Sequence, residues 1–143
     1  MAQNNVQQGR FLVEAAEDLS GKQDLIVELT SSGGRPVVRL PTATGAVPLY
    51  LLIEGAALGG NCTVEPLDPS LNIRVKVKGA VAPGDRVCLA APATAADAGK
   101  VRTVVTTTNG TYRVFLVAEE TAADGGLGLF RPNGVDSVVI TGN

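Results

Sequence analysis

The chain contains no histidine and only two cysteines, so the side chains that most often carry nucleophilic, acid–base or zinc chemistry are almost absent. This excludes a Ser–His or Cys–His dyad and a histidine-ligated zinc site, and two thiols are too few for a four-thiolate site. Any catalysis would have to come from carboxylates. Two acidic groups stand out in the sequence: Glu14, Glu17 and Asp18 near the start, and Glu119, Glu120 and Asp124 near the end.

Neither acidic group has the sequence surroundings that acid–base catalysis requires. A general acid needs an apolar pocket that raises the pKa of one carboxyl group, and nothing flanking these residues suggests one. A glycosidase-type pair would also need aromatic platforms, whereas Phe, Tyr and Trp together make up 3% of the chain. We therefore predict a protein that is not an enzyme and has no catalytic residue, no metal site and no cofactor.

Cys62 and Cys88 fit no metal-ligand spacing. We favour two buried, reduced thiols that behave as small apolar residues. A disulfide between them stays open as an alternative, and a reactive thiol is the least favoured because neither cysteine has an obvious general base nearby.

The elements that must position these residues are short strands. Apolar and polar residues alternate with a period of two in segments that Gly, Pro, Asn and Asp separate, and no window shows a helical stripe. The Ala-rich segment 91–100 has room for one helical turn that ends at Gly99. The predicted strands are Arg10–Ala15, Asp24–Thr30, Pro36–Leu40, Leu49–Glu54, Cys62–Glu65, Asn72–Lys78, Arg86–Ala90, Val101–Thr107, Thr111–Ala118, Gly128–Arg131 and Ser137–Thr141.

The length of 143 residues is typical of one domain, and 45% hydrophobic residues are enough for a core. About ten short strands at regular spacing predict an all-β fold, a sandwich or a small barrel, with little or no helix. The first nine residues are polar and rich in Gln and Asn, so we predict an N-terminal arm over 1–9 and a single all-β domain over 10–143. The arm is either frayed or ordered on a partner.

Asn109-Gly110 is a strong signal for a two-residue type I′ turn, because both residues tolerate positive φ. The sequence therefore predicts a hairpin between Val101–Thr107 and Thr111–Ala118. Both faces of this hairpin would be partly apolar, and we expect the second face to be covered by a loop, the terminal arm or a neighbouring subunit. Val104, Phe115 and Val117 lie on that face and are the predicted self-association residues.

Arg74, Lys76 and Lys78 share one face of the predicted strand Asn72–Lys78, opposite Ile73, Val75 and Val77. We favour a solvated outer face or an edge strand protected by its charges. A contact stripe for an acidic protein partner is the second interpretation.

Other partner classes are excluded by composition. A net charge of −2 and five aromatic residues argue against nucleic-acid binding. No apolar run is long enough to span a bilayer, and the polar first ten residues do not form a signal peptide, so we expect synthesis in the cytoplasm and no membrane partner.

Two stretches carry a resemblance to a known family. GAVAPGDRVCL (79–89) and VFLVAEETAADGGLGLFRP (114–132) resemble the capsid cement, or head decoration, proteins of tailed phages. The matching positions are the Pro83-Gly84-Asp85 turn, the Ala118-Glu119 pair and the Gly125-Gly126 turn.

The resemblance implies a non-enzymatic virion protein that is made in the host cytoplasm and then binds the outside of an icosahedral phage capsid. It would bind the major capsid protein and cement neighbouring subunits as a homo-oligomer, with a trimer favoured and a dimer possible. We expect the arm to contact the shell and the basic stripe to add an electrostatic contact. The predicted capsid-contact residues are Gln3, Asn4, Asn5, Val6, Gln7, Gln8, Arg10, Arg74, Lys76 and Lys78.

Three other functions stay open. A tail or neck protein would belong to the same structural class, and a carbohydrate-binding β-sandwich module is the alternative from another class. That module would have to rely on Tyr50 and Tyr112, because the chain has no Trp. An enzyme comes third.

Overall fold

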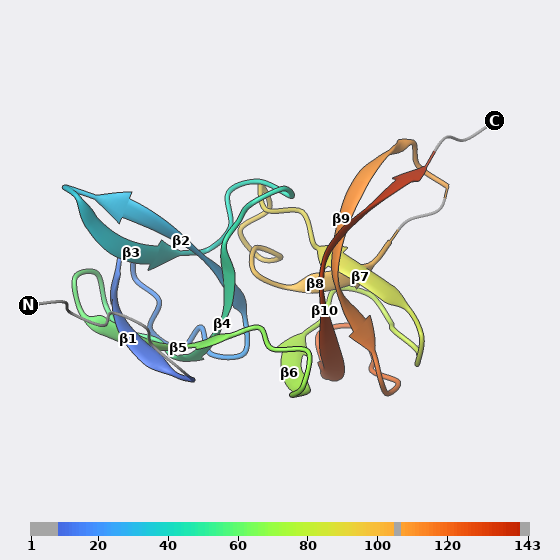
Figure 1. Ribbon diagram of the computed structural model, residues 1–143, viewed down its shortest axis with the longest axis horizontal. Coiled ribbons are helices and arrows are strands. Elements are labelled where there is room, and N and C mark those ends of the chain that lie inside the picture. The colour runs from blue at the N-terminus through green and yellow to red at the C-terminus, as the bar shows by residue number, and fades with distance from the viewer. Residues whose placement is uncertain (1–8, 105–106, 141–143) are drawn as a thin grey trace, which may run out of the picture.

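The computed structural model describes residues 9–104 and 107–140, apart from the side chains of 134–138. The described residues form ten strands in two sheets that lie side by side, and no helix (Figure 1). The prediction of an all-β fold with about ten strands is confirmed. Within the described part of the chain there is accordingly no helix that could cross a membrane.

The first sheet closes on itself as a five-stranded barrel. Its strands are β1 (Phe11–Ala15), β2 (Ile26–Ser32), β3 (Arg35–Arg39), β4 (Leu49–Glu54) and β5 (Asn61–Pro66), in the order β1-β3-β2-β4-β5. β5 pairs back to β1, and β1 and β3 form the parallel pair of the barrel. Alternate side chains point inward, so a cluster that includes Val27, Leu52 and Val64 fills the interior.

The second sheet contains β6 (Ile73–Lys76), β7 (Arg86–Leu89), β8 (Val101–Thr103), β9 (Gly110–Ala118) and β10 (Leu127–Ile140), in the order β6-β10-β9-β7-β8. Its two outer strands approach each other just beyond β6. Val77 forms an isolated parallel bridge with Val101, and Lys78 N donates to Val101 O at 2.8 Å. The second sheet is therefore nearly closed as well.

The two sheets share one hydrophobic cluster. Ile26 and Leu51 of the barrel pack with residues of the second sheet that include Val75, Phe115 and Phe130. Backbone hydrogen bonds also cross the junction, because Lys76 N donates to Asp24 O at 2.9 Å and Ile26 N donates to Gly99 O at 2.8 Å. Burial and backbone hydrogen bonds thus hold the sheets against each other.

The predicted hairpin at Asn109-Gly110 is wrong. β9 pairs with β10 and β7, and β8 pairs with β7, so β7 lies between the two strands that the prediction joined. The tight two-residue connection occurs between β2 and β3, where Ser32 pairs with Arg35. Gly33 and Gly34 have φ values of 58° and 79°, as a type I′ turn requires.

Three smaller predictions have mixed outcomes. The two strands predicted at Gly128–Arg131 and Ser137–Thr141 are one strand, β10, with a register irregularity between Pro132 and Asp136. In the Ala-rich segment, Ala98 N donates to Thr94 O at 3.0 Å, which makes a single turn, and Gly99 follows with φ +84°. The predicted turns at Gly84 and Gly125 are present, with φ values of 90° and 79°.

Candidate functional site at the junction of the two sheets

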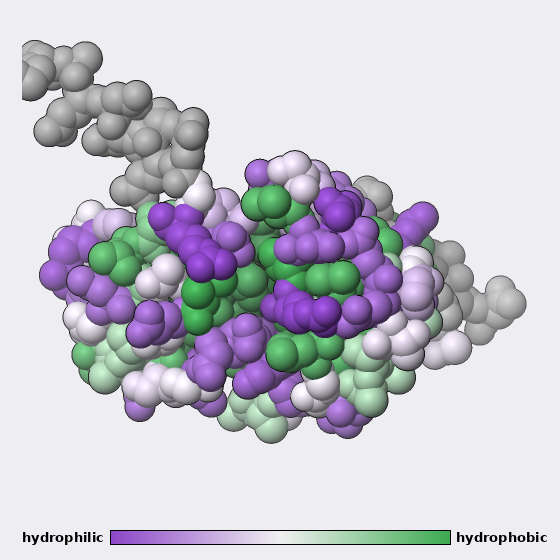
Figure 2. Space-filling view, turned by 90° about the horizontal axis from the view of Figure 1, so that it is seen from below, coloured by the Kyte–Doolittle hydropathy of each residue, from purple (hydrophilic) through white to green (hydrophobic). Residues whose placement is uncertain are grey.

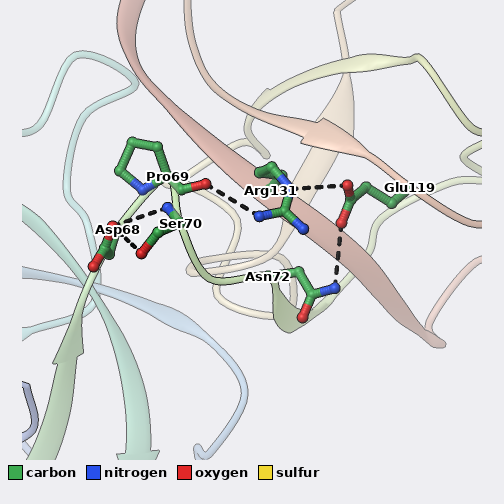
Figure 3. A network of polar contacts seen from close by, with 6 residues as sticks. All are labelled: Asp68, Pro69, Ser70, Asn72, Glu119 and Arg131. Atoms are coloured by element: carbon green, nitrogen blue, oxygen red, sulfur yellow. Dashed lines mark hydrogen bonds and ion pairs between the residues drawn. The ribbon is translucent and has the colours of Figure 1, made fainter.

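A network of polar side chains ties the β5–β6 connection to the second sheet (Figure 3). The Arg131 guanidinium on β10 donates to Glu119 Oε2 at 2.9 Å and to the backbone oxygen of Pro69 at 3.1 Å. The Asn72 amide donates to the other carboxylate oxygen of Glu119 at 3.3 Å. Within the connection itself, Ser70 donates to Asp68 Oδ1 through both its backbone nitrogen and its hydroxyl group.

These hydrogen bonds stabilise the ionised form of the carboxylates. The Arg131 hydrogen bond lowers the pKa of Glu119, and the Asn72 amide lowers it further against the opposing effect of burial. The backbone and side-chain hydrogen bonds from Ser70 lower the pKa of Asp68. A general acid needs the opposite shift, so the geometry at Glu119 suits an ion pair and not proton donation.

Four other acidic residues singled out in the sequence also have partners. The Glu14 carboxylate lies 3.4 Å from Arg35 Nη2. Glu120 accepts from Arg74, and the backbone N–H of Gly79 donates to Asp124 at 2.7 Å and lowers its pKa. Hydrogen bonds from Ser20 lower the pKa of Asp18. Among the described residues, no three histidine, cysteine or acidic side chains are grouped so that they could hold a metal ion.

The basic stripe alternates as predicted. Ile73, Val75 and Val77 are buried, whereas Arg74 and Lys78 are exposed and Lys76 is half-buried. β6 is the outer strand next to β10, but its other edge is partly occupied, because Lys76 N donates to Asp24 O and Lys78 N to Val101 O. Of the two favoured interpretations, the solvated outer face fits Arg74 and Lys78 better than the edge strand protected by its charges.

The charges of the stripe are partly neutralised within the chain. Arg74 pairs with Glu120, and Lys78 Nζ lies 3.8 Å from Asp97 Oδ1. Lys100 lies 3.9 Å from the same carboxylate oxygen. The stripe is therefore less basic than its sequence suggests, and its role as a capsid contact stays a prediction.

An apolar groove of about 400 Å³ opens beside this network, between the barrel and the second sheet. Its walls come from the start of β4, the end of β5 and the middle of β9 and β10. No charged side chain lines it. The lining residues are Val47, Pro48, Leu49, Tyr50, Pro66, Leu67, Phe115 and Pro132.

A second hollow of about 280 Å³ shares Pro132 with the groove and contains the Glu119–Arg131 pair, Val117 and Asn133. Apolar and polar linings therefore meet at one place. We call the groove, this hollow and the polar network together the junction surface. On the face seen from below, hydrophobic residues reach the surface in patches among hydrophilic ones near the middle of the molecule (Figure 2). An apolar centre with a polar rim is typical of protein–protein contact surfaces.

The predicted self-association residues lie partly inside the fold. Val104 packs with Cys88 and Val114, and Phe115 packs in the cluster that both sheets share. Other residues of this chain thus cover Val104 and Phe115, where we had expected a loop, the arm or a neighbouring subunit. Val117 is half-buried and lines the second hollow. Self-association through these residues stays a prediction, but its original reason, the hairpin, no longer holds.

The predicted contacts of the arm, Gln3, Asn4, Asn5, Val6, Gln7 and Gln8, lie outside the described residues. Arg10 is described and exposed, and its Nε lies 3.5 Å from Glu65 Oε1 on β5. Glu65 directly precedes Pro66 of the groove, so the described chain begins beside the junction surface.

Both cysteines are free and buried, as predicted. They lie in different sheets, Cys62 inside the barrel and Cys88 on β7. Burial raises the pKa of both thiols. A nearby guanidinium, that of Arg102, opposes the shift at Cys88 without overcoming it.

Sequence reasoning missed the groove residues Val47, Pro48, Pro66 and Pro132, and it named Tyr50 only as a possible sugar contact. Three prolines were an available signal: Pro48 directly before β4, Pro66 at the end of β5 and Pro132 within β10. Proline in or next to a strand is typical of edges and irregular positions.

The chain matches no protein-family model and no curated protein. Its structure is similar to that of the N base of the head fiber gp8.5 in bacteriophage phi29, with a TM-score of 0.63 and 16% sequence identity. The match covers 87% of this chain and 92% of that chain, so it includes most of both sheets. At this identity the likeness shows a shared fold.

Proposed function

We propose that this chain is a structural protein of a bacteriophage virion that binds the outer surface of the capsid. The observation that carries the proposal is the fold shared with the N base of a phage head fiber, which extends over 92% of that chain. The sequence stretches 79–89 and 114–132, which resemble phage head decoration proteins, support the same class of protein independently. Those stretches also lie side by side, since Gly84 N donates to Ala118 O at 2.8 Å.

The proposed partner is the major capsid protein, and the junction surface is the proposed contact. It offers an apolar groove for a side chain of the shell, and the neighbouring Glu119–Arg131 pair offers hydrogen bonds at the rim. Cementing follows if one protein touches two capsid subunits, because each further contact adds binding energy without a new association step. The acidic side chains that are held in ion pairs favour a binding protein over an enzyme.

The test is binding to capsids. Purified protein is mixed with undecorated shells of the phage that encodes it, and the particles are imaged by electron microscopy after sedimentation. The proposal predicts regular density on the shell exterior. Shells that stay bare at saturating protein would contradict it.

A pair of matched variants tests the junction surface separately. Val47 is 51% exposed at the groove, and Leu58 is 70% exposed in the β4–β5 connection. Val47→Asp places a charge on the contact and should weaken capsid binding about tenfold, or roughly 1.4 kcal/mol. Leu58→Asp introduces the same charge away from the groove and should bind as the wild type does. Equal binding by both variants would assign the contact to another face while leaving the capsid as partner.

We also propose that the protein acts as a homo-oligomer, with a trimer favoured. A symmetric oligomer presents several junction surfaces to a repetitive shell at once, which raises avidity. Light scattering coupled to size-exclusion chromatography measures the state directly, and a monomer at all concentrations that still coats capsids would contradict this part.

A further inference from the structure

We propose that Asn109 is a site of spontaneous deamidation, where the side-chain amide converts to aspartate and isoaspartate through a succinimide. Asn109 is exposed and lies in the β8–β9 connection, and Gly110 after it is the first residue of β9. The proposal concerns a covalent change that the chain undergoes by itself and does not depend on the proposed function.

The chemistry needs only the backbone and water. The backbone nitrogen of the following residue attacks the side-chain carbonyl carbon of the asparagine, and a five-membered imide forms as ammonia leaves. Water then adds to one of the two imide carbonyls. Opening at one carbonyl gives aspartate, and opening at the other gives isoaspartate, in which the main chain runs through the former side chain. No oxidant, metal or enzyme takes part.

The residue that follows the asparagine controls the first step. A Cβ on that residue crowds the attacking nitrogen, and glycine has none. Four asparagines lie in the described residues: Asn61, Asn72, Asn109 and Asn133. Only Asn109 and Asn133 of these precede glycine, whereas Asn61 precedes Cys62 and Asn72 precedes the β-branched Ile73.

The fold separates these sites further, because the imide cannot form in an extended strand. Asn61 pairs with Glu14 within the barrel, and the amide of Asn72 donates to Glu119 at 3.3 Å. Asn109 precedes the ladder, whose pairing with β10 starts at Gly110 opposite Ile140. The backbone of Asn109 can therefore adopt the geometry of imide formation without breaking a pair of the β9–β10 ladder.

Asn133 is the closest competitor. It lies in β10 at the irregularity between Pro132 and Asp136, where the ladder with β9 is interrupted. Paired residues flank it on both sides, and Pro132 directly before it has a fixed φ. We therefore expect Asn133 to react more slowly than Asn109 in the folded protein, although both precede glycine.

The product changes one end of the β9–β10 ribbon. The new carboxylate adds one negative charge to a chain of net charge −2, and isoaspartate adds a methylene group to the backbone directly before β9. The neighbouring turn is held by the Tyr112 hydroxyl, which donates to Thr108 O at 3.0 Å. The surface at this end thus changes with the age of the protein.

The experiment follows the full chain in mildly alkaline buffer at physiological temperature, with peptide mass spectrometry and isoaspartate-specific methyl transfer as readouts. Asn109 should convert several-fold faster than Asn133, and Asn61 and Asn72 should stay intact over the same period. In concentrated urea, where the fold is lost, Asn109 and Asn133 should convert at similar rates.

The matched variant is Gly110→Ala. A Cβ at Gly110 would lie 3.6 Å from the Tyr112 ring, which is ordinary contact, so the variant should fold. It should slow conversion of Asn109 about tenfold by crowding the attacking nitrogen and leave Asn133 unchanged. An intact Asn109 in the wild type would overturn the proposal. If the ratio of the Asn109 rate to the Asn133 rate were the same in the folded protein as in urea, the fold would have no part in making Asn109 the faster site.

Discussion

Gly99, in the Ala-rich segment between β7 and β8, contacts the barrel through the hydrogen bond that its backbone oxygen accepts from Ile26 N. Replacing Gly99 with alanine tests how firmly the two sheets are held together. Its φ of +84° lies in the left-handed region, where a Cβ costs about 1–2 kcal/mol. The new Cβ would also lie 2.9 Å from Ile26 O and 3.0 Å from Leu25 Cβ. Ile26 O is a backbone atom of β2, so rotation of a side chain cannot relieve this contact. The N–H of Ile26 also donates to Gly99 O, which holds the two backbones close together.

The structure separates these two costs. Gly125 has nearly the same φ, +79°, but a Cβ there meets no atom within 4 Å. Gly125→Ala should therefore lose only the left-handed cost of about 1–2 kcal/mol. Gly99→Ala should lose about 1–3 kcal/mol more, the typical cost of forcing an extra carbon into a packed site.

Urea unfolding of both variants gives the free energies of unfolding, and thermal unfolding gives a second measure, at roughly 3–4 °C for each kcal/mol. Equal losses in Gly99→Ala and Gly125→Ala would refute the reasoning, because they would mean that the Ala-rich segment can move away from β2 at no cost. A change in the urea dependence of Gly99→Ala alone would show that the two sheets unfold separately once this contact is weakened.

Three further predictions concern Glu119, the two cysteines and Phe130. The Arg131 hydrogen bond lowers the pKa of Glu119 in the folded protein below the ordinary value of 4.5. The ionised Glu119 carboxylate therefore stabilises the fold above the unfolded pKa, and this stabilisation is lost as the pH falls through the lower, folded pKa. As the pH is lowered, the urea midpoint of the wild type should therefore fall more than that of Glu119→Gln. An equal fall of the midpoint in both proteins would contradict this. Cys62 and Cys88 should resist a thiol reagent in the folded protein and react promptly in urea, so a fast native thiol would contradict their burial. Phe130→Ala should cost about 3–5 kcal/mol in urea unfolding, since Phe130 is fully buried in the shared cluster, and a loss below 1 kcal/mol would refute that placement.

Local alternation predicted most of the strands correctly. β4 has the same bounds as its prediction. β6 buries Ile73 and Val75 while Arg74 is exposed, and Val77 just beyond β6 is buried as well. These are properties of consecutive residues, because side chains of a strand alternate between two faces whatever the strand pairs with. Strand pairing depends on residues far apart in the chain, so local alternation predicted where the strands lie but not which strands pair.

The hairpin error shows why. Asn109-Gly110 and Gly33-Gly34 are both favourable type I′ sequences, yet only the second joins two paired strands. Between β8 and β9 the competing partner is β7, which pairs with both strands and so separates them. A turn signal states what the backbone can do locally, and long-range pairing decides whether the turn is used.

The junction surface was beyond sequence reasoning for a related reason. Its groove combines Pro48 and Tyr50 of the barrel with Phe115 and Pro132 of the second sheet, residues that approach only after both sheets have formed. Glu119 and Arg131 were each visible in the sequence, but their pairing follows from the β9–β10 register. Acidic residues that looked like a cluster thus have separate partners: Arg131 for Glu119, Arg74 for Glu120 and the backbone N–H of Gly79 for Asp124.

The likeness to the phage head-fiber base constrains where partner specificity can reside. Two chains with 16% identical residues share a fold across both sheets, so the backbone arrangement tolerates extensive change of side chains. Buried positions such as those of the shared cluster are limited to apolar residues, whereas exposed positions at the junction surface, including Val47 and the rim of the second hollow, are not. Under the proposed function, recognition of a particular shell would have to come from these exposed side chains. The proposal therefore predicts that exchange of junction residues between two capsid-binding proteins of this fold transfers capsid preference without loss of folding.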